Sequence, residues 1–267
     1  MTGPALTPPA APSLGNQRWP RVDEERPLVL VPVGSTEQHG PHLPLATDAM
    51  IAHAVAGQAA ARLLGEGRSV RVAPTLGYGA SGEHEDFAGT ISIGQEALEL
   101  VLVELARSAC RWAEGVVFVN GHGGNARPLQ RAVALLRREG RAVAWTACVL
   151  PDSDAHAGRT ETSLLQHLAP WAVRTDLLEP GNTRPVQELM PQLRAEGVRA
   201  VAPNGVLGDP TASSPELGRS LFSTLVGQLV AEVRRLDVDE QGRLTGGPPR
   251  PAGAPSGTAT PSGAGTR

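Results

Sequence analysis

The sequence contains no lysine, so all 24 of its basic residues are arginines, and 27 acidic residues nearly balance them. A net charge of −3 argues against a strong general affinity for nucleic acid or for an acidic membrane surface. No apolar run approaches the roughly 20 residues that a spanning helix needs. The first residues also lack the charged and apolar regions of a signal peptide. We therefore expect a cytoplasmic protein with neither nucleic acid nor membrane as a partner.

Cysteine is scarce as well, because Cys110 and Cys148 are the only two and neither belongs to a CxxC motif. We interpret both as buried thiols in a reducing compartment. A chain of 267 residues can bury one sizeable core without disulfides. Both ends are rich in Pro, Gly, Ala and Ser and have little to bury. We expect disordered tails at residues 1–23 and 241–267, with a single domain over residues 24–240.

Short apolar runs alternate with segments of helical period between these ends. Buried strands are predicted at residues 28–33, 70–74, 116–119 and 142–148. Helices are predicted from residue 48, over 98–112, over 129–136 and from 214 onward, with Thr47 or Asp48 as the cap of the first. This alternation predicts an α/β fold with a mostly parallel sheet covered on both faces. Ligands of such sheets bind outside the carboxyl ends of the strands.

Polar segments rich in histidine and carboxylate follow three of the predicted strands. Glu37, His39 and Asp48 come after the first strand, and His122 lies between glycines after the third. Glu37 and His39 are two positions apart, so in an extended loop their side chains point the same way. Imidazole and carboxylate together are ligands for a borderline divalent metal ion. These four residues indicate a metal site, although a hydrogen-bonded structural role for the histidines remains the alternative.

The other histidines and two competing motifs favour plainer interpretations. For His42, His53 and His167 the structural role is the preferred interpretation. The run from Gly77 to Gly82 matches GxGxxG, but no helical period follows it, so nucleotide binding is not expected. The sequence has no GxSxG elbow, which argues against a serine hydrolase.

Four blocks, taken in order, resemble the creatininase family of metal-dependent amidohydrolases over about residues 27–235. They are GSTEQHGPHLPL at 34–45 with Thr47-Asp48, SGEHEDFAGT at 81–90, NGHGGN at 120–125 and HAGRTETS at 156–163. The resemblance implies a three-layer αβα sandwich with two divalent metal ions per subunit. Zinc is the first choice, with Fe(II) or Mn(II) as alternatives. It also implies a homo-oligomer, a hexamer by family resemblance.

The resemblance assigns the metal ligands residue by residue. Glu37 and His39 would each bind one of the two metals, and Asp48 would bridge them. His122 would bind the same metal as Glu37.

One ligand position departs from creatininase itself, which has a ligand glutamate where this sequence has Gly124. The departure puts creatinine as the substrate in doubt. We expect Glu161 to fill the vacant position, as the resemblance to family members with the glycine form implies.

The same resemblance extends to the residues that contact the substrate. His156 is the candidate general acid and base, because imidazole titrates near the working pH, while a structural role beside the metal is its alternative. Glu161 is assigned to catalysis as well as to the metal. Ser81, His84 and Gly121 are expected to line the substrate pocket.

Within the family, several stretches are closest to peptidases that mature a peptide-derived redox cofactor. They are YGASGEH at 78–84, GTISIG at 89–94, DAHAG at 154–158 and GVLGDPT at 205–211. The implied substrate is a modified precursor peptide, cleaved at the amide before its altered C-terminal Val-Tyr pair to release a pyrrolidinone-type core. One alternative is a family member acting on a small cyclic amide or formamide. Another is a metal-binding oligomeric scaffold without turnover.

Overall fold

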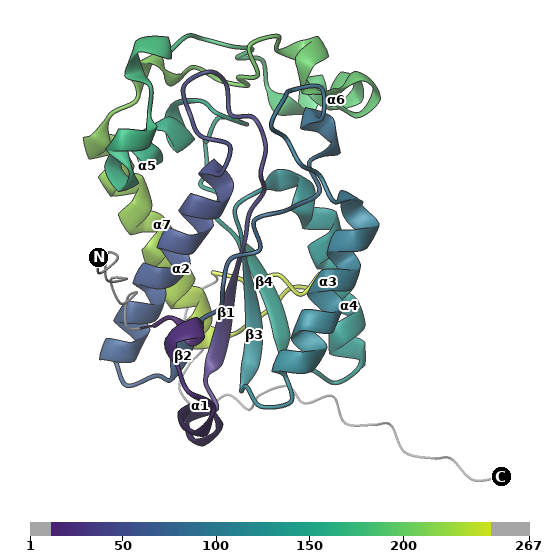
Figure 1. The fold of residues 1–267 in the computed structure, drawn as a ribbon, viewed down its shortest axis with the longest axis vertical. Helices are drawn as coiled ribbons and strands as arrows, with labels where there is room; N and C mark the ends of the chain where they lie inside the picture. The colour runs from purple at the N-terminus through teal and green to yellow at the C-terminus, as the bar shows by residue number, and fades with distance from the viewer. Residues whose placement is uncertain (1–11, 247–267) are drawn as a thin grey trace, which may run out of the picture.

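Four parallel strands form the central sheet of the computed structural model, which describes residues 12–246 (Figure 1). Across the sheet they run in the order β2 (Val70–Val72), β1 (Leu28–Val33), β3 (Gly115–Asn120) and β4 (Val143–Ala147). Each strand lies within or around the apolar run that predicted it, although β2 ends two residues early. The outermost parts of the expected tails, 1–11 and 247–267, lie outside the described residues.

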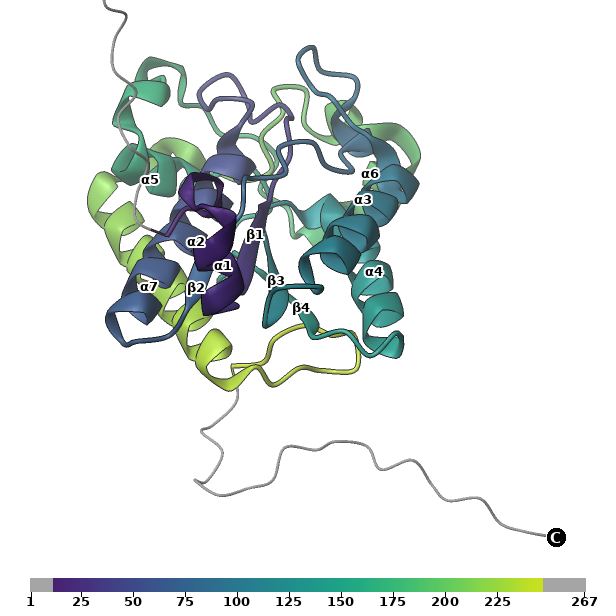
Figure 2. The ribbon, with the colours of Figure 1, turned by 60° about the horizontal axis from the view of Figure 1, so that its bottom comes forward.

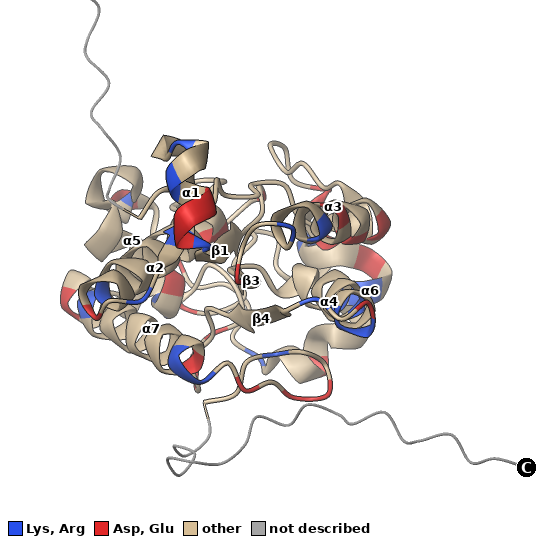
Figure 3. Ribbon diagram, turned by 90° about the horizontal axis from the view of Figure 1, so that it is seen from below, with Lys and Arg blue, Asp and Glu red and all other residues tan. Residues whose placement is uncertain are grey.

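Helices cover both faces of the sheet, as the alternating pattern predicts. One layer contains α2 (Thr47–Gly65), α5 (Arg159–Leu168) and α7 (Pro215–Arg235), and the other contains α3 (Gly94–Ala109) and α4 (Ala126–Arg138). Seen from below, the two layers flank the sheet, with many charged residues on the outer faces of the helices (Figure 3). The three-layer αβα prediction is therefore confirmed. The remaining α-helices of the described part are α1 (Trp19–Glu25) and α6 (Val186–Val201).

The strands are buried on both sides, which explains why they appear in the sequence as continuous apolar runs. In β1, Leu28 and Leu30 pack into the core under α2 and α7, whereas Val29 and Val31 pack under α3 and α4. Each fully buried side chain of this kind contributes about 1.5–3 kcal/mol relative to an exposed one. The two cores thus hold the strand ends, and the loops that follow them, in fixed positions.

Within residues 12–246 the folded part extends past both predicted domain boundaries, because residues assigned to the tails supply partners to edge strands. Near the N-terminus, the carbonyl of Pro12 accepts a hydrogen bond from the amide of Val72 in β2, and α1 follows. At the other end, Leu244 is buried and its amide donates to Trp145 in β4. Figure 2 shows the segment after α7 turning back below β4. The unpaired N–H and C=O groups of an edge strand readily pair with an extended segment. The composition of the two tails did not reveal this pairing.

Other differences are local. The helix α2 begins at Thr47 with Ala46 as its cap residue, so the predicted capping role of Thr47 or Asp48 is wrong. The Thr47 hydroxyl donates to the carbonyl of Pro44 instead. The start of α7 is as predicted, because the Ser214 hydroxyl accepts from the amide of Leu217 at 3.1 Å. No helix within residues 12–246 is long and apolar enough to cross a membrane.

Both cysteines are free thiols and are only partly buried. This is less burial than their apolar contexts predicted. Burial nevertheless raises the pKa of the Cys148 thiol to about 12.

Candidate metal centre

The candidate ligands meet at the carboxyl ends of β1 and β3, which are neighbours in the sheet. The helix after β1 covers one face and the helices after β2 and β3 cover the other. A crevice opens at such a point of reversal in parallel sheets. Glu37 follows β1, His122 follows β3, and Asp48 lies in the first turn of α2 with its carboxylate in the crevice. All three side chains are almost fully buried.

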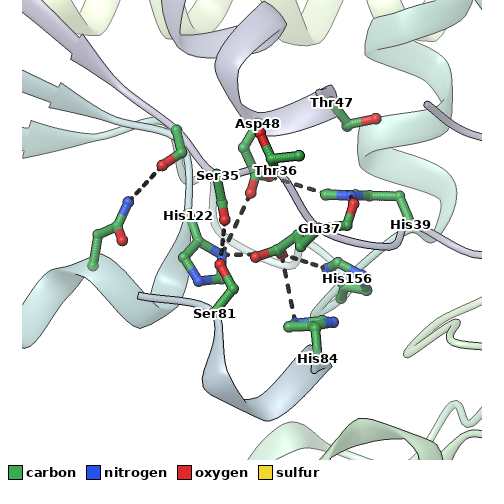
Figure 4. Close-up of polar contacts among 12 residues, drawn as sticks. Ser35, Thr36, Glu37, His39, Thr47, Asp48, Ser81, His84, His122 and His156 are labelled. Carbon is green, nitrogen blue, oxygen red and sulfur yellow. Dashed lines mark hydrogen bonds and ion pairs between the residues drawn. The ribbon is translucent and has the colours of Figure 1, made fainter. Parts of the chain in front are cut away.

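The imidazoles of His39, His122 and His156 reach this crevice (Figure 4), and each has one ring nitrogen bonded to a backbone carbonyl. The bonds run from His39 Nδ1 to the Glu37 carbonyl (3.0 Å), from His122 Nε2 to the Ala80 carbonyl (3.2 Å) and from His156 Nε2 to the Gln38 carbonyl (2.8 Å). A carbonyl can only accept, so each anchored nitrogen carries the proton. Each neutral ring therefore presents a lone pair on its other nitrogen, as histidine ligands of metals do.

The free nitrogens of two of these rings face carboxylates rather than donors. His39 Nε2 lies 3.1 Å from Asp48 Oδ1, and His122 Nδ1 lies 3.1 Å from Glu37 Oε1 and 3.4 Å from Asp48 Oδ2. Both oxygens of Glu37 and Oδ2 of Asp48 are buried without a hydrogen-bond partner. Each buried polar atom without a partner lowers the stability of the folded state by about 1–3 kcal/mol. A divalent cation would satisfy nitrogen and oxygen together, and this donor set suits zinc, manganese or iron.

The atoms form three overlapping groups, in each of which the ligand atoms lie within 4.8 Å of one another. The groups are Glu37 with Asp48 and His122, His39 with Asp48 and Glu161, and Glu37 with His39 and His156. The first two groups contain the five predicted ligands and share Asp48. The cluster is therefore suited to metal binding at the positions that the sequence indicated.

Without metal, protons bridge these groups. Burial alone would lower the pKa of His39, but the nearby carboxylates of Asp48, Glu161 and Glu37 outweigh it and raise the pKa to about 10. Burial alone would raise the pKa of Glu37, yet the imidazoles of His122, His84 and His39 hold it well below its usual range. A bound cation would take the place of those protons.

Glu161 lies at the border between the cluster and the open space in front of it. Its Oε2 accepts from the amide of Ala157 at 2.6 Å and lies 3.9 Å from His39 Nε2. The side chain is 22% exposed. Burial, opposed by His39 and reinforced by Asp48, raises its pKa to about 7. The carboxylate can therefore carry or release a proton near neutral pH.

His156 is more enclosed than a free acid–base group. Its ring packs against the ring of His39, with centroids 4.3 Å apart, and its Nδ1 lies 3.7 Å from Glu37 Oε1. Burial, together with the charge on His39 and His84, holds its pKa well below its usual range. Its Nδ1 is directed at the Glu37 carboxylate. This geometry is compatible with both roles that the sequence suggested, a general acid and base or a structural partner of the metal site.

The three residues expected in the substrate pocket have different surroundings. Ser81 is fully buried, and its hydroxyl is hydrogen-bonded to that of Ser35. His84 lines the cavity with its Nε2 3.5 Å from Glu37 Oε1, and burial lowers its pKa to about 4. Gly121 also lines the cavity, and a Cβ there would lie 2.5 Å from the Asp48 carbonyl.

Gln38 is a site residue that the sequence analysis missed, although it stands between two predicted ligands. Its Nε2 lies 2.8 Å from His84 Nδ1 and 3.1 Å from the carbonyl of Gly205. Both are acceptors, so Gln38 fixes the proton of His84 on Nε2 and ties the Gly205 loop to the site. The position of Gln38 inside the first motif, between Glu37 and His39, is the sequence signal that could have identified it.

A cavity of about 1120 Å³ opens in front of the cluster. Its lining includes Asp48, His122, His156 and Glu161, the loop after β4 and the inner side of α6. The α6 side of the lining combines apolar Val186, Met190 and Leu193 with charged Arg194 and Glu196. The site can therefore hold a ligand much larger than a small ring, with its polar end at the cluster.

Comparisons with known proteins agree with this arrangement. A profile of the creatininase family (creatinine amidohydrolase) matches residues 15–233. The mycofactocin precursor peptide peptidase of Mycolicibacterium smegmatis is 55% identical over 220 residues, covering 82% of this chain and 89% of that protein. The corresponding peptidase of Mycobacterium tuberculosis (strain CDC 1551 / Oshkosh) is 50% identical over 242 residues, covering 89% and 96%.

The fold agrees as well. A solved creatininase in its Mn form superimposes with a TM-score of 0.69 at 24% identity, covering 84% of this chain and 98% of that one. Because the family profile spans most of the chain and the named relatives are about half identical to it, this protein belongs to the creatininase family of amidohydrolases.

Proposed function

We propose that this chain is the metal-dependent peptidase that hydrolyses an amide of the mycofactocin precursor peptide. Identity of 50–55% to peptidases of that name supports the proposal. The observation that carries it is the joining of a histidine–carboxylate cluster to a cavity of about 1120 Å³. Typical small-molecule pockets have roughly 300–1,000 Å³. The size favours the end of a peptide over a small cyclic amide.

The cofactor in this proposal is a pair of divalent ions, with zinc ahead of Fe(II) and Mn(II). Glu37 and His122 would hold one ion, His39 and Glu161 the other, and Asp48 would contact both. Such a pair lowers the pKa of a bound water and polarises a carbonyl. The five proposed ligands come from α2, α5 and the segments after β1 and β3, and their proximity in the cluster supports this part of the proposal.

The protein's own groups manage the protons and exclude water. Glu161 has a partly exposed side chain at the border between the cluster and the cavity, so a role in proton transfer to the leaving nitrogen is proposed for it beside its role as a ligand. His156 presents Nδ1 to the cluster, 3.7 Å from Glu37 Oε1, and is proposed to transfer a proton through this nitrogen. The apolar side chains of α6 in the cavity lining shield the scissile bond from bulk solvent. We further propose that the enzyme works in the cytoplasm as a homo-oligomer, a hexamer by family resemblance.

Substrate choice is the direct test. The purified metal-loaded chain is incubated separately with the modified precursor peptide, with creatinine and with a formamide, and products are followed by mass spectrometry. We expect turnover of the peptide only, with release of its C-terminal core. Turnover of creatinine or the formamide in preference to the peptide would refute the peptidase assignment, and no turnover of any substrate would favour the scaffold alternative. Glu37→Gln serves as the inactive control.

A further inference from the structure

Gly124 lets three neighbouring groups lie where a side chain would stand beside the metal cluster, and one of them is the carboxylate of another residue. A Cβ placed on Gly124 would lie 2.5 Å from His122 Nε2, 2.3 Å from the Ala80 carbonyl and 2.9 Å from Glu83 Oε1. No side chain fits there unless these groups move. The missing side chain at 124 therefore lets the Glu83 carboxylate lie beside the His122 ring, where Glu83 Oε1 is 3.7 Å from Nε2.

The backbone of Glu83 is held from the opposite side by α6. Glu83 belongs to a short 3-10 turn, Gly82–His84, that is closed by the amide of His84 donating to the Ser81 carbonyl. A Cβ on Gly197 of α6 would lie 3.1 Å from the Glu83 carbonyl, and Gly197 has φ 76. That left-handed conformation favours glycine. Glycines on two separate elements thus allow the close packing that positions one carboxylate.

This carboxylate has acceptor capacity directed at the cavity. Its side chain is 35% exposed and lines the cavity in front of the cluster. Asp154, another cavity carboxylate, already accepts from the amides of Arg159 and Thr160. His122 Nε2 donates its proton to the Ala80 carbonyl, so it does not occupy the Glu83 carboxylate. Glu83 is therefore a cavity carboxylate that is not among the proposed ligands, lies against a candidate ligand ring and can still accept from a ligand.

We propose that Glu83 binds the substrate nitrogen at the scissile bond, accepting its N–H and then holding the amine that leaves. The inference rests on the proposed function. In the proposed pose the substrate carbonyl is directed at the cluster and its amide nitrogen lies on the side of the His122 ring, where Glu83 lies. Hydrolysis adds the hydroxyl of water to the acyl carbon, breaks the C–N bond and gives the remaining proton to the nitrogen. The carboxylic acid formed then releases its proton, which the amine takes up. The amine formed is cationic near neutral pH, and a carboxylate is its natural partner.

Kinetics of Glu83→Gln test the contact, with Glu85→Gln as the matched variant that removes the same charge two residues away. We expect KM for the peptide to rise about tenfold in Glu83→Gln, with a much smaller change in Glu85→Gln and unchanged metal content in both. Methylation of the scissile nitrogen should raise KM of the wild type about tenfold more than it raises KM of Glu83→Gln. Equal effects of the two substitutions, or loss of metal in Glu83→Gln, would overturn the proposal.

A binding measurement separates this inference from the peptidase assignment. Calorimetry compares valinamide, which carries a free amine, with N-acetylvalinamide on metal-loaded wild type and Glu83→Gln. We expect valinamide to bind the wild type about tenfold more tightly than the variant, and the acetylated probe to show no difference. Equal affinities for valinamide, or no binding to the wild type, would refute the role of Glu83. Selective amine binding without peptide turnover would refute the proposed function alone.

Discussion

His39 and Asp48 face each other at 3.1 Å, nitrogen to oxygen, with both side chains almost completely buried. The other nitrogen of His39 is already bonded to the carbonyl of Glu37, so the ring can meet Asp48 only through a proton or a metal ion. The second carboxylate oxygen of Asp48 faces His122 in the same way. Asp48 thus joins two imidazoles that come from different strand ends.

Replacing Asp48 with asparagine should therefore affect both ions of the proposed pair. The amide keeps the size of the side chain but removes its charge and one ligand oxygen. We expect metal content to fall from about two equivalents per chain to fewer than one and activity to be lost, as measured by elemental mass spectrometry and the peptide assay. The exposed Asp23→Asn on α1 is the control. Two retained equivalents would rule out Asp48 as the shared ligand.

Glu161→Gln should affect one ion only, because Glu161 belongs to the group with His39 and Asp48 but not to the group with Glu37 and His122. We expect about one equivalent of metal to remain and turnover to fall at least 100-fold. Elemental analysis of the same preparation used in the assay separates the two effects. Full metal content with low activity would show that Glu161 acts through its proton rather than as a ligand.

His156→Ala tests the acid–base role. If His156 transfers a proton, the variant should retain both ions and lose turnover by about 100-fold or more. The measurement is kcat alongside metal content. Normal turnover would remove His156 from the mechanism. Loss of metal would instead place it among the ligands, an arrangement that its position with Glu37 and His39 also permits.

Much of this site could be predicted from the sequence because parallel strands bring their carboxyl ends to one edge of the sheet. Glu37 and His122 are far apart in the chain, yet the apolar runs before them identified the strands that bring them together. Gln38 and Glu83 were missed because their roles depend on contacts with Gly205, Gly124 and Gly197. Such contacts arise only from the packing of distant loops, which leave no periodic pattern.

The boundaries of the fold were harder to predict for a similar reason. Pro12 and Leu244 lie in segments whose composition is typical of tails, but each bonds to an edge strand of the sheet. The helix α6 was not predicted because Pro191 and Gly197 interrupt its period. In each case a tertiary contact decides the structure, and local composition carries little information about it.

His42 connects the stability of the protein to pH. It is buried beside the site, with Nε2 2.9 Å from the Thr162 hydroxyl, as its predicted structural role requires. Burial and the charge on His39 lower its pKa to about 4, below the 6.5 of an unfolded histidine. The folded state therefore favours the neutral ring. The resulting stability is present above pH 6.5 and is lost as the pH falls through 4.

Denaturant unfolding of the metal-free protein at pH 7.5 and pH 4.5 measures this contribution. His42→Gln cannot titrate, so we expect the wild type to lose on the order of 2 kcal/mol more than this variant across that interval. His53→Gln, which removes an exposed histidine, should follow the wild type. Parallel losses in the wild type and His42→Gln would mean that His42 is protonated equally in the folded and unfolded chains. The acid sensitivity would then have to come from the buried histidines of the cluster itself.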